Sequence, residues 1–275
     1  MWNEALPAII LASRNDPAAS NIAERLITNF GFTFETNYGE DELYRKDGLT
    51  LLKTNRNILN LRGFDSELKV DTVVCVSRHS SESGKPTLTA HVPGNLGSEA
   101  PMGGEARRLA LADPYRLRSA IISLQEATEK LDLKDYSVSL EATHHGPTEL
   151  TVPVLFIEVG STRKQWGDTR AGEAAASAAM RAAMERSVGK SAVGFGGGHY
   201  APKHTRYVLE EGFAVGHIIP EHFFEDYEPT IVDSAFRKTV GECRTALIDW
   251  KGLKSEHRRI LLSRLGLIGV EIIKS

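Results

Sequence analysis

A run of β-branched residues that turns abruptly polar occupies positions 72–83, with the sequence Thr72-Val73-Val74-Cys75-Val76-Ser77-Arg78-His79-Ser80-Ser81-Glu82-Ser83. Its apolar half is typical of a strand that is buried in a sheet. Its polar half then lies at the carboxyl end of that strand, which is where open α/β sheets bind their ligands. The stretch therefore predicts an α/β fold with a functional site at one edge of the sheet.

Strand-like and helix-like segments alternate along the rest of the chain. Asp16-Pro17 and Asp113-Pro114 each predict a helix start, because the Asp side chain caps the first turn and proline fits its first position. We expect these helices to reach about Asn29 and Leu131, and the Ala-rich segment 171–186 to form a third. We predict strands at 8–12, 32–34, 43–44, 49–52, 72–77, 87–92, 137–142, 154–159, 192–195, 213–219 and 267–273, and further helices at 240–250 and 255–265.

This alternation predicts one α/β domain spanning residues 1–275, with a mixed sheet and helices on both faces. The hydrophobic fraction of 41% and the charged fraction of 25% are those of an ordinary globular protein. We see no internal repeat and no low-complexity linker that would divide the chain. The segment 93–105 is the best candidate for a long functional loop, although it could also separate two subdomains.

Composition excludes several classes of protein. Cys75 and Cys243 are the two cysteines, too few for a disulfide framework or a thiolate zinc site, so we expect a reducing, cytoplasmic environment. No apolar run has the length of a membrane span, and the N-terminus lacks a signal-peptide pattern. The net charge of −3 gives no general attraction to nucleic acid, so any such contact needs a local basic patch. We expect a monomer with no membrane contact and no obligate protein partner.

Histidines follow several of the predicted strands. His79, the pair His144-His145 and His199 each lie in a short polar or glycine-containing segment after an apolar run. Imidazole titrates near neutrality and is the commonest metal ligand, so their convergence at one sheet edge favours hydrolytic chemistry. A His-His pair in a loop can equally be a solvent-exposed feature without function. Glu158, at the end of a predicted strand, is a general base, a metal ligand or the cap of the next turn.

Two interpretations of the segment around His79 remain open. It is either a Ser-rich turn that caps its own backbone or a site in which His79 is a ligand or base. In the second case Glu82 orients the imidazole, and Arg78 or Lys85 contacts an anion. His91 could join this site, but we favour a histidine at the edge of the sheet.

The segment Gly194-Phe195-Gly196-Gly197-Gly198-His199-Tyr200 indicates close approach of the backbone to something else. It is either a flexible turn or a loop whose N–H groups bind an anion. The Gly-Lys-Ser/Thr ending of a nucleotide-binding P-loop is missing, which disfavours ATP. Lys203, His204 and Arg206 come directly after it and suit a phosphate or a 3′-terminal nucleotide. The basic stretch from Lys251 to Arg264 is either a solvated helix face or a surface that binds an RNA backbone.

Five segments together resemble the archaeal and plant type of D-aminoacyl-tRNA deacylase. They are residues 77–83, 88–95, 141–147, 156–161 and 196–202, in that family's order. The resemblance implies an α/β fold related to peptidyl-tRNA hydrolase and the nucleoside phosphorylases. It also implies a zinc-dependent hydrolase that acts on aminoacyl-tRNA and cleaves the ester bond to free the D-amino acid.

The site residues are assigned from this chemistry. Zinc held by some of His79, His144, His145 and His199 would polarise a water molecule, and Glu158 or Glu82 would accept its proton. The N–H groups of Gly196, Gly197 and Gly198 would stabilise the oxyanion or hold the terminal nucleotide.

Three alternatives stay open at this point. In a metal-free mechanism, Thr143 and Ser161 position the water and neutral histidines act as acid and base. A zinc-dependent peptidase or amidohydrolase would act on a small substrate and would need no surface that binds tRNA. In a non-catalytic RNA-binding module, the histidine segments would be structural.

Overall fold

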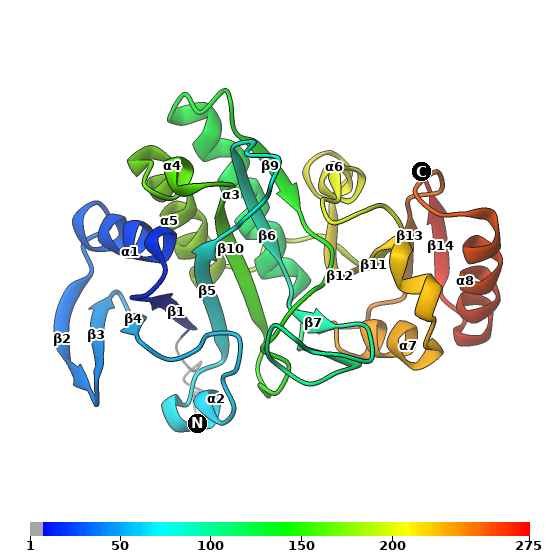
Figure 1. Ribbon diagram of the computed structural model, residues 1–275, viewed down its shortest axis with the longest axis horizontal. Helices are drawn as coiled ribbons and strands as arrows, with labels where there is room; N and C mark the ends of the chain where they lie inside the picture. Colours follow the sequence, from blue (N-terminus) through cyan, green and yellow to red (C-terminus); the bar gives the residue numbers. More distant parts are fainter. Residues whose placement is uncertain (1–7) are drawn as a thin grey trace.

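The computed structural model describes residues 8–275 and shows a mixed α/β fold with two main sheets (Figure 1). The mixed sheet predicted from the sequence is confirmed. The expectation of no signal peptide concerns residues 1–7, which lie outside the described residues.

The elements in chain order are β1 (Ala8–Ser13), α1 (Pro17–Thr28), β2 (Thr33–Tyr38), β3 (Asp41–Lys46), β4 (Leu49–Thr54), α2 (Phe64–Leu68), β5 (Thr72–Arg78), β6 (Thr87–His91), β7 (Gly94–Asn95), β8 (Arg108–Leu109), α3 (Pro114–Lys130), β9 (Ser137–Leu140), β10 (Val154–Gly160), α4 (Arg163–Trp166), α5 (Thr169–Met184), β11 (Lys190–Phe195), α6 (Pro202–Glu210), β12 (Phe213–Ile219), the 3₁₀ helix η1 (Glu221–Asp226), α7 (Pro229–Arg237), β13 (Thr245–Ile248), α8 (Ser255–Ile268) and β14 (Glu271–Lys274).

The larger sheet has eight strands in the order β2-β3-β4-β1-β5-β10-β6-β9. Its central strands β4, β1, β5 and β10 are parallel, so their carboxyl ends lie at one edge. β6 is antiparallel to β10, and β9 is parallel to β6. The side chains of residues 73–76 of β5 are all fully buried, as their unbroken apolar run predicts for a strand covered on both faces.

Helices α1, α3 and α5 form one layer against the larger sheet, because α5 packs against both of the others and against β5 and β10 (Figure 1). The Asp-Pro signals are confirmed as helix starts. The Asp16 carboxylate accepts hydrogen bonds from the N–H groups of Ala18 and Ala19, and Asp113 does the same for Tyr115 and Arg116.

The smaller sheet is fully parallel, with the strand order β12-β11-β13-β14. Its side chains alternate between two hydrophobic clusters. Ala192 and Leu247 pack with the core of the larger sheet, while Val193 and Ala246 pack in a second cluster. The first cluster includes buried residues of α6, and the second includes those of α7 and α8. Helices therefore cover both faces of this sheet.

The predicted helix at 240–250 is wrong, because the segment contains strand β13 in the middle of the smaller sheet. Its apolar run is too short to distinguish a strand from a buried helix by periodicity. The last strand begins at Glu271 rather than Leu267, since α8 continues to Ile268. Helices α2, α4, α6 and α7 are additional to those predicted. Within residues 8–275, no helix combines the length and the hydropathy that crossing a bilayer requires.

Two helix glycines lead to opposite stability predictions. A Cβ at Gly172 of α5 would lie 2.6 Å from Nδ2 of Asn21, which donates hydrogen bonds to the carbonyls of Trp166 and Asp168. We expect Gly172→Ala to lower the free energy of unfolding by about 1 kcal/mol, because losing two hydrogen bonds outweighs the gain in helix propensity. Gly266 of α8 has no atom near a built Cβ. Gly266→Ala should therefore raise the free energy of unfolding by about 0.5–1 kcal/mol.

Urea denaturation followed by circular dichroism measures both changes. Equal effects of the two substitutions would contradict the packing described at Gly172.

Candidate active site

Four histidines predicted as metal ligands meet between the two sheets. His79 follows β5, His144 and His145 follow β9, and His199 lies between β11 and α6. The ring centroids of His79 and His199 are 5.4 Å apart, those of His144 and His199 4.7 Å, and those of His144 and His145 4.4 Å. The structure therefore brings together histidines from three remote parts of the sequence.

His91 is a fifth member of this cluster, and its interpretation as an edge histidine is wrong. It is the last residue of β6, which lies between β10 and β9 and so is an interior strand. Its ring is fully buried, 4.2 Å from that of His144 and 4.8 Å from that of His145. Strand order decides this point, and a single sequence carries no direct signal for it.

Glu158, on β10, is buried against two of the histidines. Its Oε2 is 3.5 Å from Nδ1 of His79, and its Oε1 is 3.9 Å from Nε2 of His91. The Ser77 hydroxyl, on the neighbouring strand β5, donates a 2.6 Å hydrogen bond to Oε1. Burial alone would raise the pKa of Glu158, but the contacts with His79 and His91 outweigh it and hold the pKa below its usual range.

Glu141 is a second buried carboxylate, which sequence reasoning did not assign to the site. Oε1 lies 3.0 Å from Nδ1 of His79, and Oε2 lies 3.3 Å from Nε2 of His199 and 3.7 Å from Nε2 of His144. Burial would raise its pKa, but the neighbouring imidazoles lower it well below the usual value. The feature of the sequence that could have indicated Glu141 as a site residue is its position three residues before His144.

Hydrogen bonds to the backbone set the tautomers of the His-His pair, and burial sets their charge. Nδ1 of His144 donates to the carbonyl of Ala142 over 2.8 Å, and Nδ1 of His145 donates to that of Gly146 over 2.6 Å. Burial and the positive charge of His91 lower the pKa of His144 to about 2 and that of His145 to about 4. Both rings are therefore neutral near pH 7, with a lone pair on Nε2.

His79 has the opposite electrostatic environment. Burial would lower its pKa, but the contacts with Glu141 and Glu158 dominate and raise it to about 11. The Tyr200 hydroxyl is 2.7 Å from Nε2 of His79. The Trp166 indole N–H donates to the His79 carbonyl over 2.9 Å, so this tryptophan packs behind the site.

The ring nitrogens and carboxylate oxygens of the cluster are arranged so that they could ligate a metal ion. Three sets have ligand atoms within 4.8 Å of one another: His91 with His144 and His145; His79 with Glu141 and His199; and His91 with Glu141 and Glu158. Both ring nitrogens of His91 and both carboxylate oxygens of Glu141 are buried without a well-aligned hydrogen-bond partner among the described residues. Histidine nitrogen and carboxylate oxygen are ligands that zinc prefers. The four predicted histidines divide between two of these sets.

Glu82 is not part of the cluster, contrary to expectation. The chain turns away after β5, with a hydrogen bond from Gly84 N to the Ser81 carbonyl, and Glu82 is exposed on that turn. The carboxylates that contact His79 are Glu141 and Glu158, which are neighbours in space rather than in sequence.

Thr143 lies beside the site, and the proton of its hydroxyl is already donated. Nε2 of His217 donates to the Ala110 carbonyl, so its Nδ1 accepts the Thr143 hydroxyl proton over 3.1 Å. The same hydroxyl accepts the N–H of Ile218. Thr143 therefore holds the segment before the His-His pair in place, and its catalytic role stays a prediction.

The metal-free alternative also loses support at Ser161. This side chain is buried, and its hydroxyl donates to the Lys85 carbonyl over 2.6 Å. Neither of the two hydroxyls expected to position a water molecule is free to donate to one.

The glycine loop contacts its own chain. Gly196 and Gly197 have φ values of +90° and +79°, and their N–H groups donate to the carbonyls of Ile219 and Gly252. A Cβ at Gly196 would lie 2.8 Å from the Asp249 carbonyl oxygen. These two N–H groups are therefore unavailable to an anion, contrary to expectation. Gly198 is exposed, with open space around it.

The residues after this loop have different environments. His204 is buried, with Nε2 donating to the Leu247 carbonyl over 3.2 Å, so the predicted contact with a substrate is wrong. Lys203 pairs with Asp249 at 2.7 Å, and Arg206 is exposed. In the C-terminal basic stretch, Lys254 and Arg264 form ion pairs with acidic neighbours.

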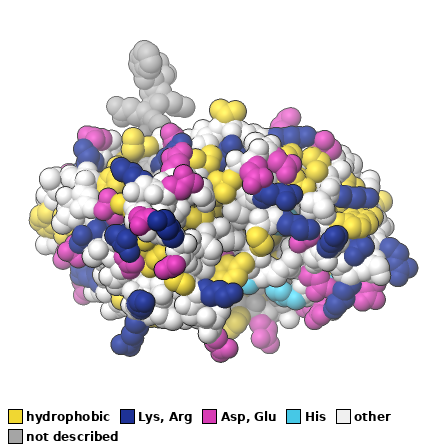
Figure 2. Space-filling model, turned by 90° about the horizontal axis from the view of Figure 1, so that it is seen from above, with side chains coloured by type: hydrophobic (Ala, Val, Ile, Leu, Met, Phe, Trp, Pro, Cys, Tyr) yellow, Lys and Arg dark blue, Asp and Glu magenta, His cyan; other side chains and the backbone are white. Residues whose placement is uncertain are grey.

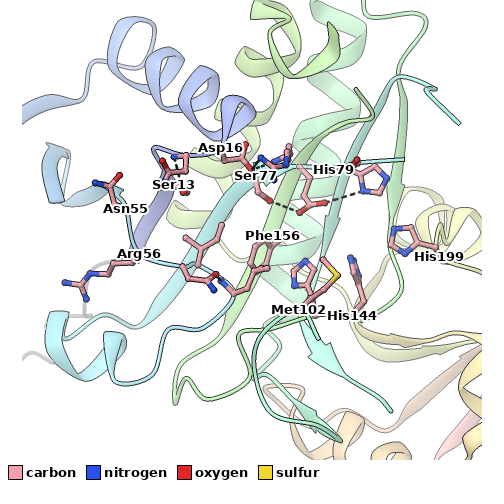
Figure 3. Close-up of a pocket in the computed structure, with 18 residues that line it drawn as sticks. Ser13, Asp16, Asn55, Arg56, Ser77, His79, Met102, His144, Phe156 and His199 are labelled. Carbon is pink, nitrogen blue, oxygen red and sulfur yellow. Dashed lines mark hydrogen bonds and ion pairs between the residues drawn. The ribbon is translucent and has the colours of Figure 1, made fainter. Parts of the chain in front are cut away.

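An open cavity of about 620 Å³ lies along this cluster. Figure 3 shows His79, His144 and His199 near one another, with Ser13, Asn55 and Arg56 toward the other end. Arg78 also lines the cavity, 4.0 Å from the Asp16 carboxylate. Glu158 belongs to the lining, whereas Glu141 does not. Figure 2 shows histidine reaching the molecular surface among mixed charges, with Lys and Arg scattered over the face.

Comparison with known proteins identifies relatives along most of the chain. A family model described as D-aminoacyl-tRNA deacylase matches residues 66–273. A Pyrococcus furiosus protein named D-aminoacyl-tRNA deacylase is 37% identical over 97% of this chain and 99% of its own length. One so named from Archaeoglobus fulgidus is 33% identical over 97% of this chain and 96% of its own length.

One solved structure has the same fold over nearly the whole chain. A crystal structure of a conserved protein of unknown function has a TM-score of 0.89 and 31% identity, covering 98% of this chain and 95% of that one. A futalosine hydrolase of Helicobacter pylori has a TM-score of 0.41 at 10% identity, covering 65% of this chain and 98% of that one, a likeness too low to carry an argument. The family match and the extended identity together show that this chain belongs to the D-aminoacyl-tRNA deacylase family.

Proposed function

We propose that this protein hydrolyses the ester bond between a D-amino acid and the terminal ribose of tRNA, using water activated at a zinc site. Membership of the family supports the substrate class, since the relatives are named D-aminoacyl-tRNA deacylase. The observation that carries the chemistry is the cluster of buried histidine and glutamate side chains beside the cavity. Ester hydrolysis needs a nucleophilic water and a base, and this cluster can provide both.

Two sets of residues could hold zinc. His144 and His145 would bind with His91. In the second set, His79 would give up a proton as it binds the metal with His199 and Glu141. The neutral state of His144 and His145, with Nε2 unprotonated, is the form that ligates a metal. The chemistry that zinc would supply at these residues is that of a Lewis acid, which lowers the pKa of a bound water molecule from about 16 to about 7.

Glu158 is the residue we propose as the base, because its carboxylate lines the cavity and lies beside the rings of His79 and His91. It accepts the proton of the attacking water as the new bond to the ester carbon forms. When the bond to the ribose oxygen breaks, the same proton passes from Glu158 to that oxygen. Glu141 lies outside the lining beside His79 and His199, so we assign it to holding the metal rather than to the proton transfer.

The tRNA would reach the site along the side that carries His199. Gly198 and Arg206 are exposed, and α6, which carries Lys203 and Arg206, begins three residues after His199. Arg78 offers a further cation at the cavity. Lys and Arg side chains bind phosphates in a salt-dependent way, as contacts with an RNA backbone require.

The first test compares D-tyrosyl-tRNA with L-tyrosyl-tRNA and removes the metal. We expect release of tyrosine from the D-ester, at least a tenfold loss of rate after exhaustive chelation, and recovery with added zinc, because water itself is a poor nucleophile at neutral pH. Release of the amino acid is measured beside the metal content by inductively coupled plasma mass spectrometry. Full deacylation by protein that contains no metal would refute the zinc part of the proposal.

The second test addresses the proposed base. Glu158→Gln keeps the shape of the side chain but cannot accept a proton, so kcat should fall by about 100-fold or more. Glu82→Gln is the matched control on the exposed turn and should leave kcat unchanged. Thermal unfolding of both variants shows whether they fold equally well. An unchanged kcat in Glu158→Gln would exclude it as the base.

A third test separates a tRNA substrate from a small one. Arg206→Ala should raise KM for aminoacyl-tRNA and weaken its dependence on salt, by a slope change of about one for each lost phosphate contact. Hydrolysis of a small aminoacyl ester should stay the same. Arg237→Ala, another exposed arginine on α7, is the control. Identical salt slopes for all three proteins would remove Arg206 from the RNA contact.

A further inference from the structure

One wall of the cavity is apolar, in contrast to the polar remainder. Ile58 and Leu59, from the segment after β4, line it together with Met102 and with Phe156 of β10. Figure 3 shows Met102 beside His144, with Phe156 further along the cavity. The apolar wall therefore adjoins the histidine cluster directly. Pockets of this kind bind the apolar part of a ligand, while a few polar groups fix its orientation.

The loop that carries Met102 is firmly held although the side chain itself is 54% exposed. Gly146 N donates to the Met102 carbonyl over 3.1 Å, and Asn95 Nδ2 donates to the Gly103 carbonyl over 2.8 Å. A Cβ at Gly103 would lie 2.1 Å from the Leu59 carbonyl oxygen. A Cβ at Gly146 would lie 2.3 Å from the same oxygen, so three backbone segments meet here in close contact.

This close packing has a consequence for the cavity. The segments that contain Leu59, Met102 and His145 are fixed relative to one another, so the apolar wall keeps its distance from the reactive groups. The Met102 side chain can still change its rotamer, because it is unbranched and exposed. Methionine in such a place adapts to ligands of different shape.

Neither a nucleobase nor a phosphate suits this wall. Phe156 is fully buried, with its ring stacked on His91 at 5.3 Å and against the His145 ring at 4.8 Å, so it offers no open face for a base. Arg56, at the far end of the cavity, pairs with Glu67 and Asp41. Arg56 is the cavity-lining cation closest in sequence to Ile58, and its charge is therefore already balanced by these two carboxylates.

We propose that Ile58, Leu59 and Met102 form the subsite for the side chain of the esterified amino acid, and that this subsite favours large apolar and aromatic side chains. The inference rests on the proposed function and adds the class of amino acid to it. With the side chain on this wall, the ester lies at the histidine cluster. The tRNA then leaves toward His199, on the other side of the cluster.

Met102→Ala tests the subsite with three substrates, D-tyrosyl-, D-phenylalanyl- and D-alanyl-tRNA. We expect kcat/KM to fall about tenfold for the two aromatic substrates and less than about twofold for the alanyl ester, since a lost apolar contact penalises only side chains that reach it. Met102→Trp should narrow the subsite and again penalise the aromatic substrates more. Met184→Ala is the matched control, because Met184 is 65% exposed at the end of α5. It should leave all three values unchanged.

The outcomes separate the possible occupants of the wall. An equal loss on all three substrates would show that Met102 contacts the shared tRNA end, and this would overturn the inference. Unchanged values in both Met102 variants would overturn it as well. Release of D-amino acids by the wild-type protein, measured first, tests the proposed function separately, and its absence would refute both. Equal thermal unfolding midpoints establish that the variants are folded.

Discussion

The burial of two carboxylates among histidines is the constraint on which the site depends. Glu141 and Glu158 are 2% and 4% exposed, and removing an isolated carboxylate from water is costly, by several kcal/mol. The imidazoles around them offset this cost and keep both groups ionised. In return the carboxylates raise the pKa of His79, while burial keeps His144 and His145 neutral. One buried cluster thus holds anionic, cationic and neutral groups side by side.

Backbone hydrogen bonds between the two sheets hold this cluster in place. Ala142 N donates to the His199 carbonyl and Thr143 N donates to the Ile218 carbonyl, each over 2.8 Å. The chain after β9 therefore leaves the larger sheet and pairs with the loop and strand of the smaller one. His199 meets the His-His pair only because of this pairing. The site is a product of the contact between the sheets rather than of either sheet alone.

Local signals in the sequence predicted much of the fold but only part of the site. The Asp-Pro caps and the unbroken run of β5 depend on neighbouring residues, and both predictions are confirmed. The partners of His79 depend on strand order, which a single sequence does not reveal. Proximity in sequence favours Glu82, whereas β10 and the segment after β9 supply the real contacts. The edge position expected for His91 is wrong for the same reason.

The glycine loop shows why composition alone cannot identify a binding site. Its glycines correctly indicated a close approach of backbone, since only a residue without Cβ fits beside the Asp249 carbonyl at Gly196. The partner is the turn after β13, however, and the N–H groups of Gly196 and Gly197 are already used. The residues that follow this turn can still contact a ligand, and His199 is the one that lies in the histidine cluster. A glycine-rich loop indicates ligand binding only after its own N–H groups have been accounted for.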